Sequence, residues 1–210
     1  GYGKSLHDAL AEVHARAIRG DVAGDSEVPR LVETHLYTPY AYPALKQKLE
    51  ESAGRVLSAY LEANRPLFDK LEFSEKTIEI NLGGGVSVVG RIDLVRRIDT
   101  GETTIVDLKS SERAQAEEVT ETQLHVYALG YQELTGRAAD KVEIYELDEG
   151  KREARSVDEE FIAEVKEKVG AAADALRQGA LPAKPEVKKC TGCDYRGICP
   201  AAKLEPKAKP

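Results

Sequence analysis

The chain has 210 residues, 41% of them hydrophobic and 32% charged, which fits a folded soluble protein with one core, or one core and a small appendage. No apolar run approaches the roughly 20 residues that span a bilayer and no secretory signal opens the chain, so we expect a cytoplasmic protein. A net charge of −7 argues against a uniformly basic nucleic-acid binder. The chain begins with glycine and contains no methionine, so we also expect a fragment of a longer polypeptide.

The hydrophobic pattern predicts an α/β fold. Amphipathic helices and strand-like runs alternate in this order: helix 5–20, a short helix near 31–37, helix 44–65 stopped by Pro66, strands 76–82, 86–98 and 103–111, helix 120–134, strand 140–148 and helix 157–178. Strands joined by short turns must be mutually antiparallel, whereas a strand reached through a helix joins by a crossover. We therefore expect a mixed central sheet flanked by helices.

The C-terminal segment differs from the rest of the chain, and we predict two domains, a core over 1–181 and a basic cysteine-containing segment over 182–210. Seven Lys and Arg residues stand there against three Asp and Glu. Cys190, Cys193 and Cys199 lie at spacings of two and five residues, beyond the proline-containing linker LPAKPEVKK. In a cytosolic protein such a cluster favours a metal or iron–sulfur site over disulfides, although both zinc and iron–sulfur centres usually take four ligands.

Two of the predicted strands carry charged residues in apolar surroundings. Asp93 ends a G-R-I-D run, and Asp107 and Lys109 flank Leu108 in the run TIVDLK. Residues two apart on a strand share a face, so Asp107 and Lys109 point the same way, and in a hairpin the Asp93 carboxylate converges with that of Asp107. Two close carboxylates repel unless a cation lies between them, and Mg²⁺ or Mn²⁺ suits oxygen ligands. A solvated surface hairpin is the alternative interpretation.

These runs resemble the PD-(D/E)XK nuclease superfamily, and their surroundings are similar to its RecB-type branch. G-R-I-D is followed by D-L-K, the early helix contains G-x-x-x-H as Gly3 to His7, and the helix after D-L-K contains Q-x-x-x-Y as Gln123 to Tyr127. The four elements occur in the family order and span nearly the whole chain. The resemblance implies a core of the order αβββαβ with a cysteine-cluster tail.

The resemblance also implies roles for the matching residues. Asp93 and Asp107 would bind the metal directly, with the Leu108 carbonyl as a third oxygen, and His7 would complete the coordination through a neutral imidazole nitrogen. Lys109 would orient or activate a water, or neutralise charge developing on a phosphate.

The remaining polar candidates are less specific. Gln123 and Tyr127 lie four apart on one helix face, where they would brace the site or contact a nucleic-acid backbone, and burial of Tyr127 in the core is the alternative. Some relatives use an acidic residue before the sheet, but the sequence does not choose among Glu72, Glu75 and Glu79. Two further histidines match no family position and are expected to be structural, namely His14 and His125.

For the cysteines, the resemblance implies a [4Fe–4S] cluster in the parent protein. In the iron–sulfur members the fourth cysteine precedes the G-x-x-x-H helix, and this sequence, which begins two residues before Gly3, contains no such cysteine. Zinc with a borrowed ligand, or free or partly oxidised thiols, remain alternatives.

The expected function is that of a Mg²⁺- or Mn²⁺-dependent deoxyribonuclease domain acting on DNA single strands or ends in recombination or repair. The context is similar to the nuclease module at the C-terminus of UvrD/RecB-type helicases, which implies a helicase motor in the same polypeptide or complex and a cytoplasmic, nucleoid-associated location, with no membrane partner. The alternatives are a standalone CRISPR-adaptation nuclease, a non-catalytic DNA-binding or docking module that keeps the fold, and an unrelated zinc-binding interaction domain.

Overall fold

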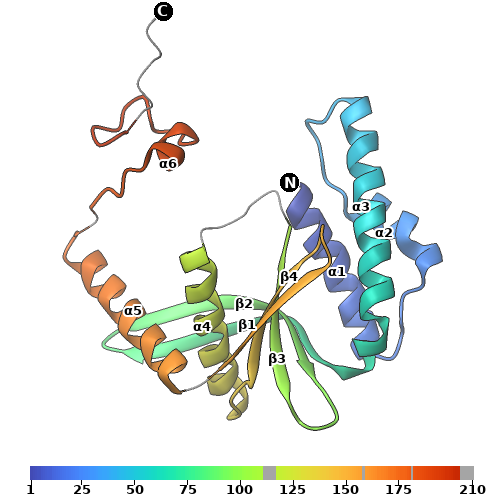
Figure 1. The fold of residues 1–210 in the computed structure, drawn as a ribbon, viewed down its shortest axis with the longest axis horizontal. Coiled ribbons are helices and arrows are strands. Elements are labelled where there is room, and N and C mark those ends of the chain that lie inside the picture. The colour runs from blue at the N-terminus through green and yellow to red at the C-terminus, as the bar shows by residue number, and fades with distance from the viewer. Residues whose placement is uncertain (111–116, 158, 181, 204–210) are drawn as a thin grey trace, which may run out of the picture. The chain divides into compact units, whose positions relative to one another are not determined.

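The computed structural model describes residues 1–110, 117–157, 159–180 and 182–203, without the side chains of residues 117–121, 159 and 161. The chain forms two compact units, Gly1–Lys168 and Val169–Pro210. The first unit contains every strand of the sheet and most of the helices (Figure 1).

The N-terminal half of the first unit is helical, with three α-helices and two short 3-10 helices: α1 (Tyr2–Ile18), η1 (Asp25–Glu27), α2 (Val28–His35), α3 (Pro43–Asn64) and η2 (Arg65–Lys70). Helix α1 buries Leu6, Leu10, Val13 and Ala17, whose spacing of three and four residues places them on one face. Helix α3 begins at Pro43, where a missing N–H costs nothing, and ends two residues before Pro66.

A five-stranded mixed sheet follows in the described residues, in the order β1 (Leu71–Gly83), β2 (Val86–Arg97), β3 (Thr103–Lys109), β4 (Lys141–Glu146) and β5 (Lys151–Ser156). Strands β1, β2 and β3 form an antiparallel meander, and helix α4 (Glu117–Thr135) leads from β3 to β4, which pairs with β3 in parallel. The predicted α/β fold with a mixed sheet is therefore confirmed.

Two strands differ from the predictions. Strand β1 begins at Leu71 rather than at residue 76, so Glu72, Glu75 and Glu79 lie within the sheet and not before it. Strand β5 was not predicted because KREARS carries four charged residues and lacks apolar alternation. It is an exposed edge strand that pairs with β4 through its backbone. The predicted end of the third strand at Ser111 lies outside the described residues.

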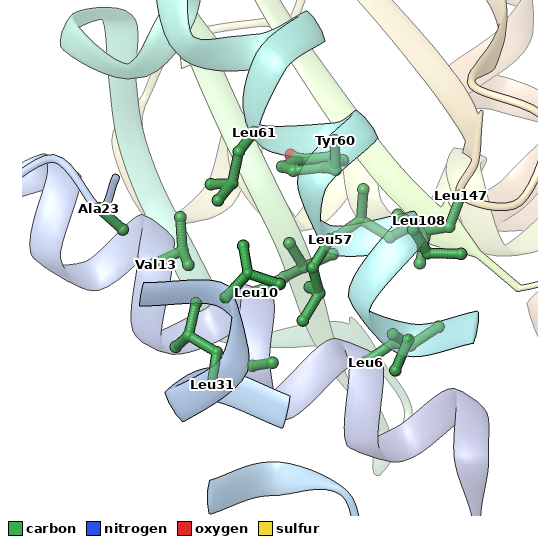
Figure 2. Close-up of a cluster of buried hydrophobic side chains, with 14 of the residues drawn as sticks. Leu6, Leu10, Val13, Ala23, Leu31, Leu57, Tyr60, Leu61, Leu108 and Leu147 are labelled. Atoms are coloured by element: carbon green, nitrogen blue, oxygen red, sulfur yellow. The ribbon is translucent and has the colours of Figure 1, made fainter. Parts of the chain in front are cut away.

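The main hydrophobic cluster lies between the N-terminal helices and the sheet. Side chains of α1, α2 and α3 pack there with residues of β2, β3 and β4, and Figure 2 shows Leu108 of β3 among Leu6, Leu57 and Leu147. Because successive strand residues point to opposite faces, Asp107 and Lys109 lie on the other side of β3 from this cluster. Helix α4, which packs against β1, β2 and β3, supplies the partner of Lys109 there.

Helix α4 comes unusually close to β1 at one point. A Cβ atom on Gly130 would lie 2.2 Å from Cδ1 of Ile78, a contact that no real side chain makes. Ile78 on β1 is buried, and Tyr131, which follows Gly130 on α4, is fully buried too. Glycine at position 130 therefore lets α4 lie directly on β1, and this fixes where Gln123 and Tyr127, earlier on the same helix, are held.

Helix α5 (Glu159–Arg177) crosses the limit between the two units, and the short helix α6 (Val187–Thr191) occupies part of the segment expected to be a linker. Leu181 and residues 204–210 lie outside the described residues, and the expected domain limit between 181 and 182 stays a prediction. Within the described ranges, none of the helices combines the length and apolar character needed to cross a bilayer.

Candidate active site

The two aspartates lie where the ladder between β2 and β3 ends. The last residues paired across these strands are Leu94 and Val106, so Asp93 and Asp107 occupy the next position on each strand. In place of a further backbone bond, the Asp93 carboxylate accepts a hydrogen bond of 2.9 Å from the backbone N–H of Leu108. Both aspartates are buried. The two strands are therefore joined at this point by the Asp93 side chain, which takes the place of the next backbone hydrogen bond.

A line of polar groups runs from Asp107 to helix α4. Lys109 Nζ lies 2.9 Å from Asp107 Oδ2 and donates a hydrogen bond of 3.0 Å to Gln123 Oε1. Gln123 Nε2 in turn donates to the Tyr127 hydroxyl at 2.6 Å. The D-x-K and Q-x-x-x-Y elements thus meet through Lys109 and Gln123, which holds the ammonium group beside the carboxylate.

Helix α1 brings the third element to the same place. Nδ1 of His7 lies 3.7 Å from Oδ1 of Asp93, which is beyond hydrogen-bond distance but within reach of a shared cation. One turn earlier, a Cβ on Gly3 would lie 2.6 Å from Oγ of Ser110, the residue after Lys109. The glycine of G-x-x-x-H therefore allows the start of α1 to approach the end of β3.

Glu75 is the acidic residue that the sequence did not single out. It follows Ser74, which pairs with Leu94, and precedes Lys76, which pairs with Ile92, so it stands opposite Asp93 on β1. Its φ is +51°, an uncommon backbone conformation for a residue with a side chain. Ligand atoms of Glu75, His7 and Asp93 lie within 4.8 Å of one another.

The other two glutamates of β1 make contacts elsewhere. Glu72 pairs with Arg137 and accepts a hydrogen bond from the Tyr131 hydroxyl, and Glu79 accepts one from Ser87. Glu75 itself is held by Arg91 of the G-R-I-D run, whose Nε lies 2.7 Å from Oε2. The sequence could not identify Glu75, because only the register between β1 and β2 determines which glutamate lies opposite Asp93.

The electrostatics of the site are those of crowded, poorly hydrated acids. Burial raises the pKa of Asp107 to about 6, against the opposing effect of Lys109, and burial also raises the pKa of Glu75. The neighbouring Asp93 carboxylate raises the pKa of His7, and Glu75 and Asp107 add to that effect. Burial raises the pKa of the Tyr127 hydroxyl to about 12, so it stays neutral. Loss of hydration is thus the main cause at Asp107, Glu75 and Tyr127, and the neighbouring Asp93 carboxylate is the main cause at His7.

The residues fit a hard divalent cation. Within the described residues, Oδ2 of Asp107 is buried and no donor meets the geometry of a hydrogen bond to it, although the Lys109 ammonium lies close by. Carboxylate oxygens with one imidazole are a donor set suited to Mg²⁺ or Mn²⁺. Leu108 lies beside them, and the role of its carbonyl as a ligand stays a prediction.

These groups line an open cleft of about 310 Å³. Its walls come from the start of α1, the middle of β2, the end of β3, and α4: Gly1, Tyr2, Gly3, Lys4, His7, Asp93, Asp107, Leu108, Lys109, Ser110 and Gln123. Every predicted site residue of the first unit except Tyr127 lines the cleft, and Tyr127 contacts it through Gln123.

The remaining sequence candidates lie away from this centre. His14 is buried, with Nε2 2.8 Å from the Tyr60 hydroxyl, and His125 is buried on α4. Cys190, Cys193 and Cys199 are half-buried free thiols. Among the described residues their sulfurs do not gather closely enough to form a three-ligand group. Three thiols in this arrangement do not fit a complete cluster site, and the cluster of the parent protein stays a prediction.

Comparison with known proteins agrees with the motifs. No curated protein is similar enough to match the chain. Solved structures that resemble it include "Crystal structure of SSO0001", with 17% identity over 95% of this chain and 86% of that chain and a TM-score of 0.45, and a candidate exonuclease from Eubacterium rectale, with 15% identity over 92% and 82% and a TM-score of 0.48. The family model of the PD-(D/E)XK nuclease superfamily matches residues 1–200. Since that match covers nearly the whole chain and contains the motifs that line the cleft, the chain belongs to the PD-(D/E)XK nuclease superfamily.

Proposed function

We propose that this domain is a Mg²⁺- or Mn²⁺-dependent deoxyribonuclease whose active site is the cleft where the pairing of β2 with β3 ends. The observation that carries the proposal is the pair of buried carboxylates on adjacent strands, Asp93 and Asp107, with Lys109 held 2.9 Å from the second by Gln123. Buried charge without full compensation is costly to folding, so its presence favours a functional role.

In this proposal each residue has one task. Asp93 and Asp107 bind the cation directly, with His7 and the Leu108 carbonyl completing its ligands and Glu75 holding a position opposite Asp93. When bound, a divalent ion polarises a phosphate oxygen and lowers the pKa of a water. Lys109 orients the attacking water and offsets negative charge that develops on the phosphate. Gln123, braced by Tyr127, fixes the Lys109 ammonium on the cleft side of β3.

The substrate and setting follow from the family resemblance and from the charge of the chain. An acidic chain with a basic C-terminal segment suits a cleft that accepts a strand locally, and does not suit a domain that coats duplex DNA. We therefore propose DNA single strands or ends as substrate, and a helicase motor in the same polypeptide or complex as partner. A [4Fe–4S] cluster at the cysteine segment of the parent protein, with zinc as the alternative, belongs to the same proposal, as does nucleoid association.

The test is cleavage of an end-labelled single-stranded DNA in Mn²⁺, with EDTA as one control. Asp107→Asn removes a metal ligand with almost no change in size, and we expect it to abolish cleavage. The matched variant is Asp99→Asn, which changes an exposed aspartate in the turn between β2 and β3, at the other end from the cleft. We expect it to cleave like the unmutated chain.

Thermal unfolding of both variants distinguishes lost chemistry from lost structure. Cleavage that persists in EDTA or in folded Asp107→Asn would contradict the proposed site. DNA binding by the unmutated chain without cleavage in Mn²⁺ or Mg²⁺ would favour a non-catalytic module that keeps the fold.

A further inference from the structure

The loop between α2 and α3 displays tyrosines that the proposed chemistry does not use. Tyr37, Tyr40 and Tyr42 are 70%, 99% and 65% exposed, whereas most other tyrosines of the described chain are buried in the core. A tyrosine that is nearly fully exposed contributes little to folding, because its ring removes almost no area from water. Three such rings within six residues form a surface feature, which we call the tyrosine loop (residues 37–42).

Two prolines and a closed turn restrict the backbone of the tyrosine loop. Pro39 lies within it and Pro43 directly follows it, and each proline fixes its own φ. The backbone N–H of Ala41 donates a hydrogen bond of 3.1 Å to the Thr38 carbonyl, which closes a turn around Tyr40. The rings are thus presented on a backbone that loses little freedom when a ligand binds.

The tyrosine loop is fastened to the start of α1, the same turn that lines the cleft. The backbone N–H of Tyr37 donates a 3.0 Å hydrogen bond to Oγ of the buried Ser5, the residue directly after Lys4 of the cleft wall. The Tyr2 hydroxyl, also at the cleft, donates to Oγ of Ser52 on α3 at 3.0 Å. In Figure 1 the beginning of α3 and the N-terminus of α1 lie at the same end of the first unit.

The charge of this region does not repel a phosphodiester. Residues 36–49 include two lysines and no carboxylate, and Glu50 and Glu51 follow them on α3, in a chain whose net charge is −7. Lys48 makes no ion pair with any described residue, and Lys46 lies 3.7 Å from Glu50 in an exposed pair of little energetic value. Exposed aromatic rings with cationic residues close by in the sequence are the elements with which proteins hold unpaired nucleotides.

We propose that the tyrosine loop is a stacking platform for the bases of single-stranded DNA that enters the cleft, with Tyr40 as its main contact. Stacking needs unpaired bases with free faces, so the platform selects single strands or frayed ends over intact duplex. Tyr40 lies three residues from the tie at Tyr37, about 10 Å of chain at most, and Ser5 at that tie directly follows Lys4 of the cleft wall. This inference deepens the proposed nuclease function and rests on it for the choice of substrate.

The test compares affinities for a fluorescein-labelled oligo-dT and for a blunt duplex of the same length, by anisotropy in EDTA so that cleavage does not interfere. We expect Tyr40→Ala to weaken binding of the single strand about tenfold, and the triple alanine variant at 37, 40 and 42 to weaken it further, with duplex binding unchanged. Tyr40→Trp keeps a ring and should retain or improve affinity. Leu176→Ala, which changes an exposed apolar side chain on α5, is the control and should bind normally.

The outcomes separate this inference from the proposed function. Equal single-strand affinity of the triple variant and the unmutated chain overturns the platform, even if cleavage is intact, and leaves the loop available to a protein partner. An equal loss for duplex and single strand also overturns it, because stacking requires unpaired bases. A selective loss of single-strand binding supports the platform, even if the unmutated chain fails to cleave and the nuclease proposal itself falls.

Discussion

Gly130→Ala tests whether the close contact of α4 with β1 positions the site. The added methyl would lie 2.2 Å from Cδ1 of Ile78, 3.0 Å from its Cβ and 3.1 Å from its Cγ1. The contacts with Cβ and Cγ1 need only a small adjustment, but Cδ1 belongs to a side chain packed in the core with little room to rotate, so α4 must shift away from β1. The shift would be transmitted to Gln123, two turns earlier on the helix, and through it to Lys109.

Two opposing effects set the size of the change. Alanine favours a helix over glycine by about 1 kcal/mol, whereas overpacking a core costs about 1–3 kcal/mol. The net loss in the free energy of unfolding should be about 1 kcal/mol, which in a chain of this size lowers the melting temperature by roughly 2–4 °C. Gly54→Ala on α3 is the matched control, because no atom lies within 4 Å of the position of its added Cβ. That variant should be stabilised by about 0.5–1 kcal/mol.

Urea unfolding of the single and double variants measures the contact directly. Ile78→Val removes the atom at 2.2 Å and should cost about 0.5–1.5 kcal/mol alone, but together with Gly130→Ala it should cost clearly less than the sum of the two. Cleavage by Gly130→Ala should fall while that of Gly54→Ala stays normal. If Gly130→Ala were as stabilising as Gly54→Ala, or its effect simply added to that of Ile78→Val, the reasoning about this contact would be refuted.

Three further predictions concern the site and its support. Gln123→Ala should lower the turnover rate about 10- to 100-fold with little change in metal affinity measured by titration calorimetry, because it releases Lys109 and leaves the carboxylates in place. Gly3→Ala should lower cleavage about tenfold, and adding Ser110→Ala, which removes the clashing Oγ, should restore it; failure of this rescue would refute the role given to Gly3. Burial lowers the pKa of His14 to about 4, so between pH 6.5 and 4 the unfolded chain takes up a proton that the native chain does not, and the free energy of unfolding should fall by about 3 kcal/mol over that range. His14→Gln, compared by urea unfolding at several pH values, should lose that part of the slope, and an unchanged slope would contradict the assignment.

Much of this architecture could be predicted because local patterns and global fold agree. The apolar spacing of α1 and the glycine-bounded strands of the β2–β3 hairpin are local signals, and both elements form as expected. The approach of Asp93 to Asp107 followed from the two-residue period of strands and the expected hairpin between the two strands. Likewise, Gln123 and Tyr127 were expected on one helix face, and a 2.6 Å hydrogen bond joins them.

The features that the sequence did not reveal depend on register and tertiary context. Glu75 differs from Glu72 and Glu79 only through its position opposite Asp93 and its positive φ, and neither property is encoded in a local pattern. Strand β5 resembles a solvated loop because its stabilisation comes from backbone pairing with β4 at an edge. The position of Tyr37 could not be predicted either, because it is held to α1 by a hydrogen bond to Ser5, 32 residues earlier in the chain.

At the end of β3 the fold holds charged side chains, Asp107 and Lys109, whose burial costs free energy of folding. Leu108 packs into the main core between Asp107 and Lys109, so the hydrophobic cluster holds the strand end in place whatever the state of its neighbours. Burial then raises the pKa of Asp107 to about 6, which means that its ionised form costs free energy at neutral pH. Because apolar packing supplies the positioning, the end of β3 does not depend on its two charged side chains for its place in the fold. The pairing of β2 with β3 stops one residue before the site. A further backbone pair would use the N–H of Leu108, which instead donates its hydrogen bond to the Asp93 carboxylate.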